Sequence, residues 1–285
     1  VHAVDLGTHA RSFIHLVARL PPMGQEIERW RRSVGQQRVA FDCELFAPAN
    51  RTVDDVGFFD SIMLARPYRS FLALNGSSPQ TNTQTLDGST LPAPALVGLG
   101  AKMVVSGRRR DDLKQVQVQE LATTYAVSAP LPRTTFFADA DVTFLDDAHV
   151  LELFRHGATA FRKTMFLDPS AYPPDLQRDP GSSVVQAAPV YDRPDSDEVV
   201  VRIDARSAGF VRVMESWDEG WSATLDGRAT DVLVADTFAM AVRVPPGVHE
   251  VRFTYRTQGA RTGLALTAIS ALLLALFGFR IRTGL

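Results

Sequence analysis

An uncharged apolar run near the C-terminal end is the feature that most constrains this chain. Residues 262–279 read TGLALTAISALLLALFGF and lie between Arg261 and Arg280. At about 1.5 Å per residue, a helix of this length reaches roughly 27 Å, close to the hydrocarbon core of a bilayer, which is about 30 Å thick. A globular helix normally keeps a polar face, whereas only Thr267 and Ser270 interrupt this stretch. The run therefore predicts a transmembrane helix over residues 259–282, with a buried core helix as the alternative.

The predicted membrane anchor is made of side chains that favour lipid over water. They are Leu264, Leu266, Ile269, Leu272, Leu273, Leu274, Leu276, Phe277 and Phe279. Four arginines precede the run, at positions 243, 252, 256 and 261, and two follow it, at positions 280 and 282. The positive-inside rule alone would therefore place the preceding mass in the cytoplasm. Because long folded domains cross membranes largely regardless of charge, this count does not decide the orientation.

The part of the chain before the anchor has the composition of a soluble protein. Charged residues make up 22% of the sequence, hydrophobic residues 45%, and the formal net charge is −2. The length suffices for two domains with their own cores. A near-neutral balance argues against nucleic acid as a partner, because phosphate binding needs clustered cations. The tightest basic cluster, residues 108–110, runs into Asp111 and Asp112 and is predicted to be a solvated turn.

Two further features bear on the cellular compartment. Cys43 is the sole cysteine, so no intrachain disulfide can form, and this usage fits either the cytoplasm or the outside of a bacterium. The sequence begins at Val1, with no initiator methionine and no apolar signal sequence. We therefore expect the chain to be a piece of a longer polypeptide.

Helical and strand patterns alternate up to residue 180, which predicts a mixed α/β domain over residues 1–180. The predicted helices cover residues 24–33, 62–66 and 146–155, and the predicted strands cover residues 37–41, 102–106, 123–127 and 134–138. Pro67 is expected to break the second helix or to begin another at Tyr68. Residues 75–90, rich in Ser, Asn, Thr and Gly, predict a loop.

Period-two alternation over residues 181–258 predicts an antiparallel β-sandwich of about seven short strands. Residues 198–204 and 210–215 are expected to be partner strands. Residues 221–225 and 228–234 should form a hairpin, because Asp226-Gly227 tolerates the positive φ angles of a two-residue turn. The predicted fold class is therefore α+β: a mixed α/β N-terminal part, an antiparallel β-sandwich and one C-terminal transmembrane helix.

Two motifs in the second half stand directly before the apolar run. Residues 214–232 read MESWDEGWSATLDGRATDV, and residues 240–256 read MAVRVPPGVHEVRFTYR. Together they resemble the C-terminal end of the bacterial YfhO-like membrane proteins, where a Gly-Trp strand, an Asp-Gly turn and a Pro-x-Gly-x-His strand precede the last transmembrane helix. Residues 53–72, 96–106 and 129–136 extend the resemblance upstream in the same order.

The resemblance implies a large polytopic protein of the bacterial cell membrane, related to GT-C-type glycosyltransferases. Such a protein moves sugars from polyprenyl-phosphate donors to envelope glycans or teichoic acids on the outer face. Its acidic catalytic residues would lie in an early outer loop that this chain lacks, so no catalytic residue is assigned here. The family's usual tyrosine follows a proline in this chain, Pro67, which leaves the role of Tyr68 open.

No pattern in the sequence points to a metal, a cofactor or an activated nucleophile. The candidate glycan contacts are Asp55, Asp60, Tyr68, Trp217 and Trp221. Aromatic faces beside carboxylates are typical of sugar sites. Acidic residues at a helix start also serve as caps, however, and a tryptophan in a sandwich also packs in the core.

Two functions remain open on this evidence. In the first, the chain is the extracytoplasmic module of a YfhO-type protein and assists glycosyl transfer to an envelope glycan, by capping the active site or holding the acceptor. Its partners would be the lipid bilayer, the polyprenyl-linked sugar or glycan, and the missing N-terminal transmembrane portion, and the chain alone would have no transferase activity. In the second, it is a noncatalytic, membrane-anchored binding or scaffolding protein that faces the cytoplasm.

Overall fold

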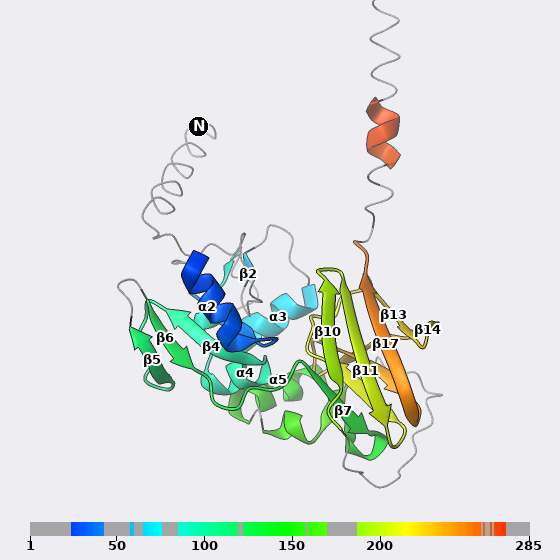
Figure 1. Cartoon of the computed structure of the whole chain (residues 1–285), viewed down its shortest axis with the longest axis horizontal. Helices are drawn as coiled ribbons and strands as arrows, with labels where there is room; N and C mark the ends of the chain where they lie inside the picture. Colours follow the sequence, from blue (N-terminus) through cyan, green and yellow to red (C-terminus); the bar gives the residue numbers. More distant parts are fainter. Residues whose placement is uncertain are drawn as a thin grey trace, which may run out of the picture. The chain divides into compact units, whose positions relative to one another are not determined.

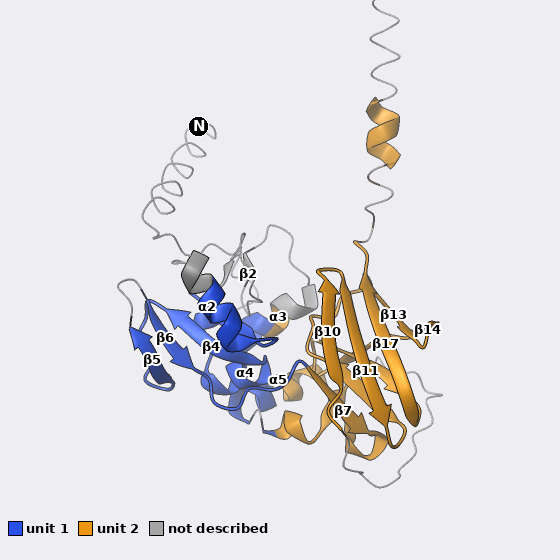
Figure 2. Cartoon of the chain, viewed as in Figure 1, with its two compact units in different colours: residues 1–63, 71–133, 151–159 blue, residues 64–70, 134–150, 160–285 orange. Residues whose placement is uncertain are grey.

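The computed structural model confirms a mixed α+β architecture with several, mostly antiparallel, sheets. It describes residues 24–42, 58–59, 65–75, 85–118, 122–157, 159–169, 187–257, 259, 263 and 265–271. The chain forms two compact units, which Figure 2 shows in separate colours. Unit 1 comprises residues 1–63, 71–133 and 151–159, and unit 2 comprises residues 64–70, 134–150 and 160–285.

Unit 1 is built on a four-stranded sheet with the strand order β1-β4-β6-β5. The strands are β1 (Arg38–Phe41), β4 (Ala101–Ser106), β6 (Thr123–Ala126) and β5 (Lys114–Val118). Strands β1 and β4 are parallel, and the other two pairs are antiparallel. A short ribbon of β2 (Phe58–Phe59) and β3 (Thr85–Leu86) and the 3₁₀ turn η2 (Gly88–Thr90) belong to the same unit.

Helix α2 (Gly24–Val34) closes one part of the unit 1 core. Trp30 and Val34, four residues apart on one helix face, pack with residues of β1 and β4, and the Trp30 and Phe41 rings meet edge-on at 5.3 Å. Gly35 ends the helix with a φ of 62° and donates its N–H to the Arg31 carbonyl. The predicted helix over residues 24–33 and the strand that follows it are thus confirmed.

Helix α4 (Ala93–Gly98) supplies a second part of this core through Ala95 and Leu96. A side chain at Gly98 would lie 2.3 Å from a ring carbon of Phe154 on helix α5 (Asp147–His156), so only glycine allows this approach.

Unit 2 contains a five-stranded antiparallel sheet with the order β10-β11-β17-β13-β14 (Figure 1). The strands are β10 (Val190–Asp195), β11 (Glu198–Ala205), β17 (Gly247–Tyr255), β13 (Trp221–Leu225) and β14 (Arg228–Thr230). The predicted hairpin between β13 and β14 is confirmed, with φ angles of 51° at Asp226 and 80° at Gly227.

The second sheet of unit 2 has six strands in the order β7-β12-β16-β15-β9-β8. They are β7 (Thr134–Ala138), β12 (Gly209–Val213), β16 (Ala239–Val244), β15 (Leu233–Ala235), β9 (Met165–Leu167) and β8 (Val142–Phe144). Inward residues of both sheets share one hydrophobic core, among them Val201, Phe253, Val211 and Val242. The two sheets therefore pack as a sandwich, but it is larger than the one predicted for residues 181–258, because β7, β8 and β9 take part in it, and β8 and β9 are parallel.

The outer face of the five-stranded sheet is polar. Glu198 pairs with Arg252, which also pairs with Glu250 at 2.9 Å, and Glu250 pairs with Arg202 at 3.0 Å. This ladder of alternating charges crosses β11 and β17 and is largely open to solvent. One face of this sheet thus packs in the core while the other faces water.

The six-stranded sheet carries a fully buried ion pair on its other face. Arg212 Nη1 donates to Asp236 Oδ2 at 2.6 Å, and neither side chain has exposed surface. The same nitrogen donates to the Phe161 carbonyl in η4 (Ala160–Arg162), and the guanidinium lies 4.7 Å from the centroid of the Phe137 ring. Asp236 in turn accepts from the Phe166 N–H at 2.9 Å. Both charges are therefore paired and hydrogen-bonded inside the unit.

Several sequence-based expectations need correction. Helix α3 (Ala65–Leu74) runs through Pro67 without a break, because a proline in the first turn removes an N–H that has no partner in the helix. Residues 228–234 are not one strand, since β14 ends at Thr230 and β15 joins the other sheet. Strand β12, expected to pair with residues 198–204, pairs instead with β7 and β16. Residues 75–90 contain β3 and η2.

The predicted boundaries at residues 180 and 258 stay a prediction. In the structure, three strands that precede residue 180, namely β7, β8 and β9, lie in the six-stranded sheet of unit 2. Residues 265–271 are helical, but among the residues that the structure describes no helix is long and apolar enough to cross a membrane. Of the predicted anchor, residues 260–262, 264 and 272–282 lie outside the described residues.

We expect Asp236→Ala to destabilise the protein by about 3–5 kcal/mol, because it leaves the Arg212 charge buried without its partner. Urea unfolding followed by tryptophan fluorescence would measure the loss. Glu250→Gln, in the exposed ladder, is the control and should change stability little, since surface ion pairs contribute weakly. Equal losses in the two variants would contradict the special role of the buried pair.

Candidate functional site

The structure tests the position of only some of the predicted glycan contacts. Asp55 and Asp60 lie outside the described residues. Tyr68 lies within α3, but its side chain is not described. Trp217 and Trp221 lie at one end of the sandwich, and both are half-buried against its core. Their role in binding a glycan stays a prediction.

A short segment holds Trp221 against the last strand. The Trp221 and Tyr255 rings are 5.2 Å apart, and the Arg256 N–H donates to the Gly220 carbonyl at 2.9 Å. A side chain at Gly220 would come within 2.6 Å of the Tyr255 ring and 2.7 Å of the Arg256 carbonyl, so glycine is required by this close approach. Burial and the neighbouring Asp218 carboxylate raise the pKa of Tyr255.

Glu215 joins the two sheets near Trp217. Its carboxylate accepts from the Tyr191 hydroxyl at 2.8 Å and from Arg193 Nη1 at 3.2 Å, both on β10. The Trp217 N–H donates to the Phe238 carbonyl at 2.6 Å. These contacts show a structural role for this end of the sandwich: they close it and fix the chain between β12 and β13.

The Asp-Gly turn and the histidine of the last strand meet at the opposite end of β17. His249 Nδ1 lies 2.7 Å from Asp226 Oδ2, and the Glu250 N–H donates to Asp226 Oδ1 at 2.9 Å. The Glu250 N–H and His249 lower the pKa of Asp226. The two motif residues therefore fasten the β13–β14 turn to β17.

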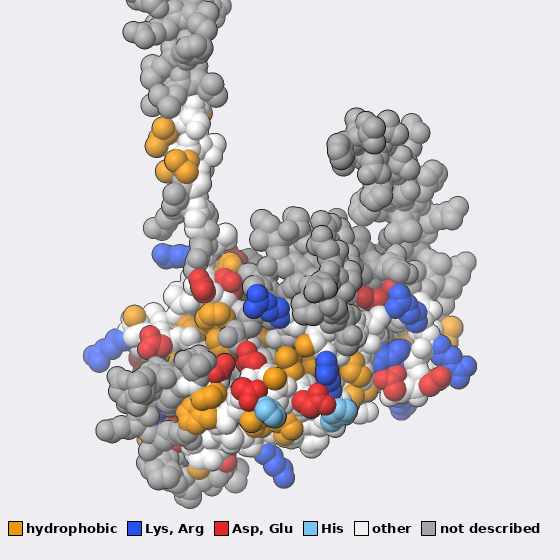
Figure 3. All heavy atoms as spheres, turned by 180° about the vertical axis from the view of Figure 1, so that it is seen from behind, with side chains coloured by type: hydrophobic (Ala, Val, Ile, Leu, Met, Phe, Trp, Pro, Cys, Tyr) orange, Lys and Arg blue, Asp and Glu red, His pale blue; other side chains and the backbone are white. Residues whose placement is uncertain are grey.

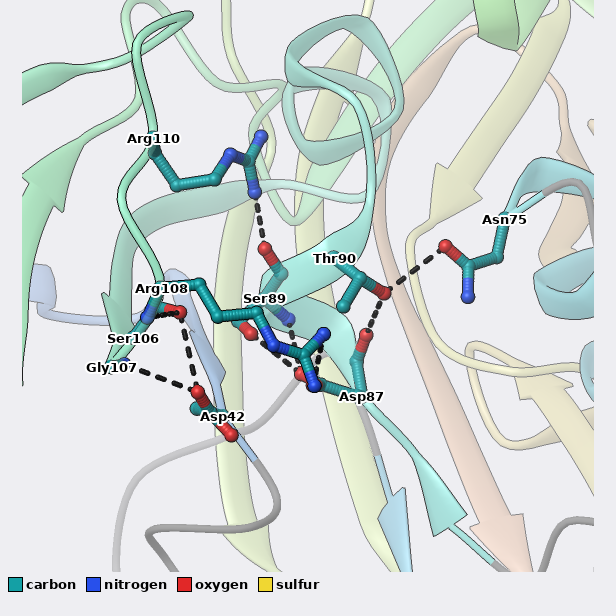
Figure 4. Close-up of polar contacts among 9 residues, drawn as sticks. All are labelled: Asp42, Asn75, Asp87, Ser89, Thr90, Ser106, Gly107, Arg108 and Arg110. Atoms are coloured by element: carbon teal, nitrogen blue, oxygen red, sulfur yellow. Dashed lines mark hydrogen bonds and ion pairs between the residues drawn. The ribbon is translucent and has the colours of Figure 1, made fainter.

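A second polar cluster lies in unit 1, where the parallel strands β1 and β4 end (Figure 4). Asp42 follows β1 directly and is almost fully buried. Its Oδ2 accepts from Ser106 Oγ at 3.3 Å and from the Gly107 N–H at 3.1 Å, where the chain leaves β4. Asp42 thus binds the loop after one strand to the loop after the other.

Asp87 approaches the same edge from the start of η2 (Figure 4). Its Oδ1 accepts from the N–H and the hydroxyl of Ser89, at 2.9 and 2.6 Å. Its Oδ2 lies 3.8 Å from Arg108 Nη1. Burial raises the pKa of Asp87 more than the Ser89 hydrogen bonds lower it, and the negative charge of Asp42 adds to the rise.

Arg110 connects this loop to η2. Its guanidinium pairs with the Asp112 carboxylate through two hydrogen bonds of 2.8 and 2.7 Å and donates to the Ser89 and Leu91 carbonyls. The sequence predicted a solvated turn here, which is wrong for Arg110, whose side chain is mostly buried. It is right for Arg109, which is 85% exposed and pairs only with Asp111 among the described residues.

The unit 1 cluster can offer hydrogen bonds of both kinds to a ligand, from an acceptor carboxylate and a donor guanidinium. Within the described part of the chain, no group of three or more His, Cys, Asp or Glu side chains is arranged to hold a metal ion. No local pattern predicts this site, because Asp42, Asp87 and Arg108 are far apart in the chain.

The predicted anchor is described only in part. Leu266 and Ile269 lie in the helical residues 265–271 and are both exposed, and the Thr267 hydroxyl donates to the Gly263 carbonyl. The other seven predicted anchor residues lie outside the described residues.

On the face shown in Figure 3, acidic and basic side chains are interspersed with hydrophobic ones.

One family model matches part of this chain. Residues 215–267 match the family model described as bacterial membrane protein YfhO. The match spans β13 to β17 and continues into the apolar run. It confirms the resemblance over these residues and supports an association with a membrane. Comparisons with curated proteins and with solved structures gave no match.

We expect Asp87 to titrate above the usual aspartate range and Asp226 below it, as carboxyl ¹³C NMR would measure. Asp87 holds its proton more tightly in the folded state, so its stabilising contribution is present at low pH and is lost as the pH rises through the raised pKa. Asp226 behaves oppositely, and its contribution is lost as the pH falls through the lowered pKa. Coincident titrations of the two groups would contradict both assignments.

Proposed function

We propose that this chain is the membrane-anchored, extracytoplasmic C-terminal module of a YfhO-type protein, which assists glycosyl transfer from a polyprenyl-phosphate sugar to an envelope glycan. The observation that carries the proposal is the family match over residues 215–267. This match joins the last strands of the sandwich to the start of the apolar run, so the folded domain and the anchor belong to one motif.

The connection after β17 is short. Strand β17 ends at Tyr255, and the apolar run begins at residue 262. A linker of this length spans at most roughly 20–25 Å, which keeps the end of the sandwich near the surface of any bilayer that the run enters. The charged ladder on the outer face of the five-stranded sheet suits a domain that stays in water.

The module's part in the reaction is to hold the acceptor glycan near the catalytic groups. Those groups would lie in the transmembrane portion before Val1, in agreement with the resemblance described above. The fold supplies two rigid places for such a role, the aromatic end of the sandwich and the polar cluster of unit 1. The outward orientation is part of the proposal, since the arginine count alone would favour the opposite side.

Cysteine labelling in intact cells tests the anchoring and the orientation. The full-length protein is expressed from its own gene, with Cys43→Ser as the background. In this background Val248→Cys, at an 80% exposed position, should react with a membrane-impermeant maleimide. Val242→Cys, at a buried position, is the matched control and should remain unlabelled. Deleting residues 262–279 from the chain produced alone should move it from the membrane fraction to the soluble fraction. Labelling of Val248→Cys only after permeabilisation would contradict the outward orientation.

A transfer assay tests whether the catalytic groups lie outside this chain. Membranes that contain the full-length protein should transfer a labelled sugar from a polyprenyl-phosphate donor to envelope glycan, whereas the purified chain alone should show no turnover. Activity of the chain alone would contradict the placement of the catalytic groups outside it. No activity of the full-length protein would favour a noncatalytic binding or scaffolding role.

A further inference from the structure

We propose that the carboxyl edge of strands β1 and β4 in unit 1 is a binding site for a neutral glycan, with Asp87 and Arg108 as the direct contacts. The biological identity of the glycan rests on the proposed function, whereas the site itself rests on the geometry of this edge. It lies in a part of the chain that the family match does not reach.

Three segments meet at this edge. They are the residue after β1, the start of η2 and the loop after β4, and they bring Asp42, Asp87 and residues 106–110 together (Figure 4). Strands β1 and β4 are the parallel pair of this mixed sheet, so their carboxyl ends lie at the same edge. This arrangement brings loops from distant parts of the chain together there.

The Asp87 carboxylate has an acceptor to offer. One oxygen is occupied by the two hydrogen bonds from Ser89. The other, Oδ2, has no donor within hydrogen-bonding distance among the described residues, since its nearest cation, Arg108, is 3.8 Å away. The Asp87 side chain is 18% exposed, so most of the carboxylate is removed from water. A donor supplied by a ligand would therefore stabilise it.

The Arg108 guanidinium places donors next to this acceptor. Its side chain is 54% exposed, which leaves it accessible to a ligand. A hydroxyl group both donates and accepts, so two neighbouring hydroxyls of a sugar ring can donate to Asp87 and accept from Arg108 together. Hydrogen bonds that involve a charged group are the stronger ones, and here each hydroxyl would have a charged partner.

The neighbouring residues hold these two side chains in place. Asp42 fixes the start of the loop after β4 through Ser106 and Gly107, and Arg110 fixes the same loop to η2 through two carbonyls. Arg108 lies between these two attachments. A site that is ordered before binding loses less entropy when the ligand arrives.

The charges at this edge favour a neutral ligand over an ionic one. Asp42 and Asp87 would repel a phosphate, and Arg108 would repel a free metal cation. Arg110 and Asp112 neutralise each other through their paired hydrogen bonds. Sugar hydroxyls use both signs of the cluster and carry no charge that either would repel.

The test uses the full chain in detergent micelles and an array of oligosaccharides built from glucose, galactose and N-acetylhexosamines, in neutral and phosphorylated forms. We expect binding to at least one neutral oligosaccharide, followed by titration calorimetry with that compound. Arg108→Gln and Asp87→Asn should each weaken the affinity about tenfold or more, because each removes a hydrogen bond to a charged group. Arg109→Gln, the next residue in the same loop, is the matched control and should bind as the wild type does.

Three outcomes would overturn the proposal: no neutral oligosaccharide binds, only phosphorylated ones bind, or Arg109→Gln weakens binding as much as Arg108→Gln.

Thermal unfolding of each variant checks its fold. If Asp87→Asn unfolds, Arg108→Gln decides alone, because an exposed arginine can be replaced at little cost to stability. Binding that depends on Arg108 would support the proposed site even if cysteine labelling placed the chain inside the cell. Absence of binding in a chain that labels from outside would refute the site and leave the orientation intact.

Discussion

The buried ion pair between Arg212 and Asp236 is the constraint around which unit 2 is arranged. Removing two charges from water is costly, and the cost is offset only when both are paired and hydrogen-bonded. Arg212 lies on β12, and Asp236 directly follows β15, with β16 between them. Arg212 is paired with Ala241 of β16, whose small side chain leaves room for the guanidinium to reach across. A sheet with another strand order or a slipped register would leave these charges apart and buried.

The same pair fixes an unusual turn. Asp236 and Thr237 have φ angles of 49° and 70°, a conformation that a β-branched residue such as Thr237 adopts only when its surroundings impose it. Asp236 donates its N–H to the Phe166 carbonyl and accepts the Phe166 N–H, which joins β15 to β9. The strained turn, the ion pair and the pairing of two short strands therefore support one another.

Much of the five-stranded sheet could be predicted from sequence because its strands alternate. In β17, Val251 and Phe253 are buried while Arg252 and Thr254 are not, as the period-two pattern predicts. Strand β12 shows no such pattern, since both of its faces are covered, and its pairing with β7 joins residues far apart in the chain. No local signal could place that contact. The same is true of the unit 1 cluster. The sequence around Arg110 predicts a solvated residue, whereas the structure shows its guanidinium bound to the Leu91 carbonyl just after η2.

The residues that carry the resemblance to the YfhO family have structural roles in this chain. Gly220 allows the Trp221 segment to pass the Tyr255 ring, and the Asp226 turn is tied to His249. The match over residues 215–267 therefore includes positions that close the sandwich. The polar edge of unit 1 shares no residue with the two motifs at residues 214–232 and 240–256.

Strand β17 is the central strand of its sheet, hydrogen-bonded to β11 on one side and to β13 on the other, and it is the strand that continues toward the apolar run. Tension applied to the chain after Tyr255 would act along the strand, at right angles to its ladder hydrogen bonds. Two rows of bonds would have to yield together in shear, whereas an edge strand would peel away one bond at a time. The topology thus makes the sandwich resist unfolding by a force applied through the segment that follows β17.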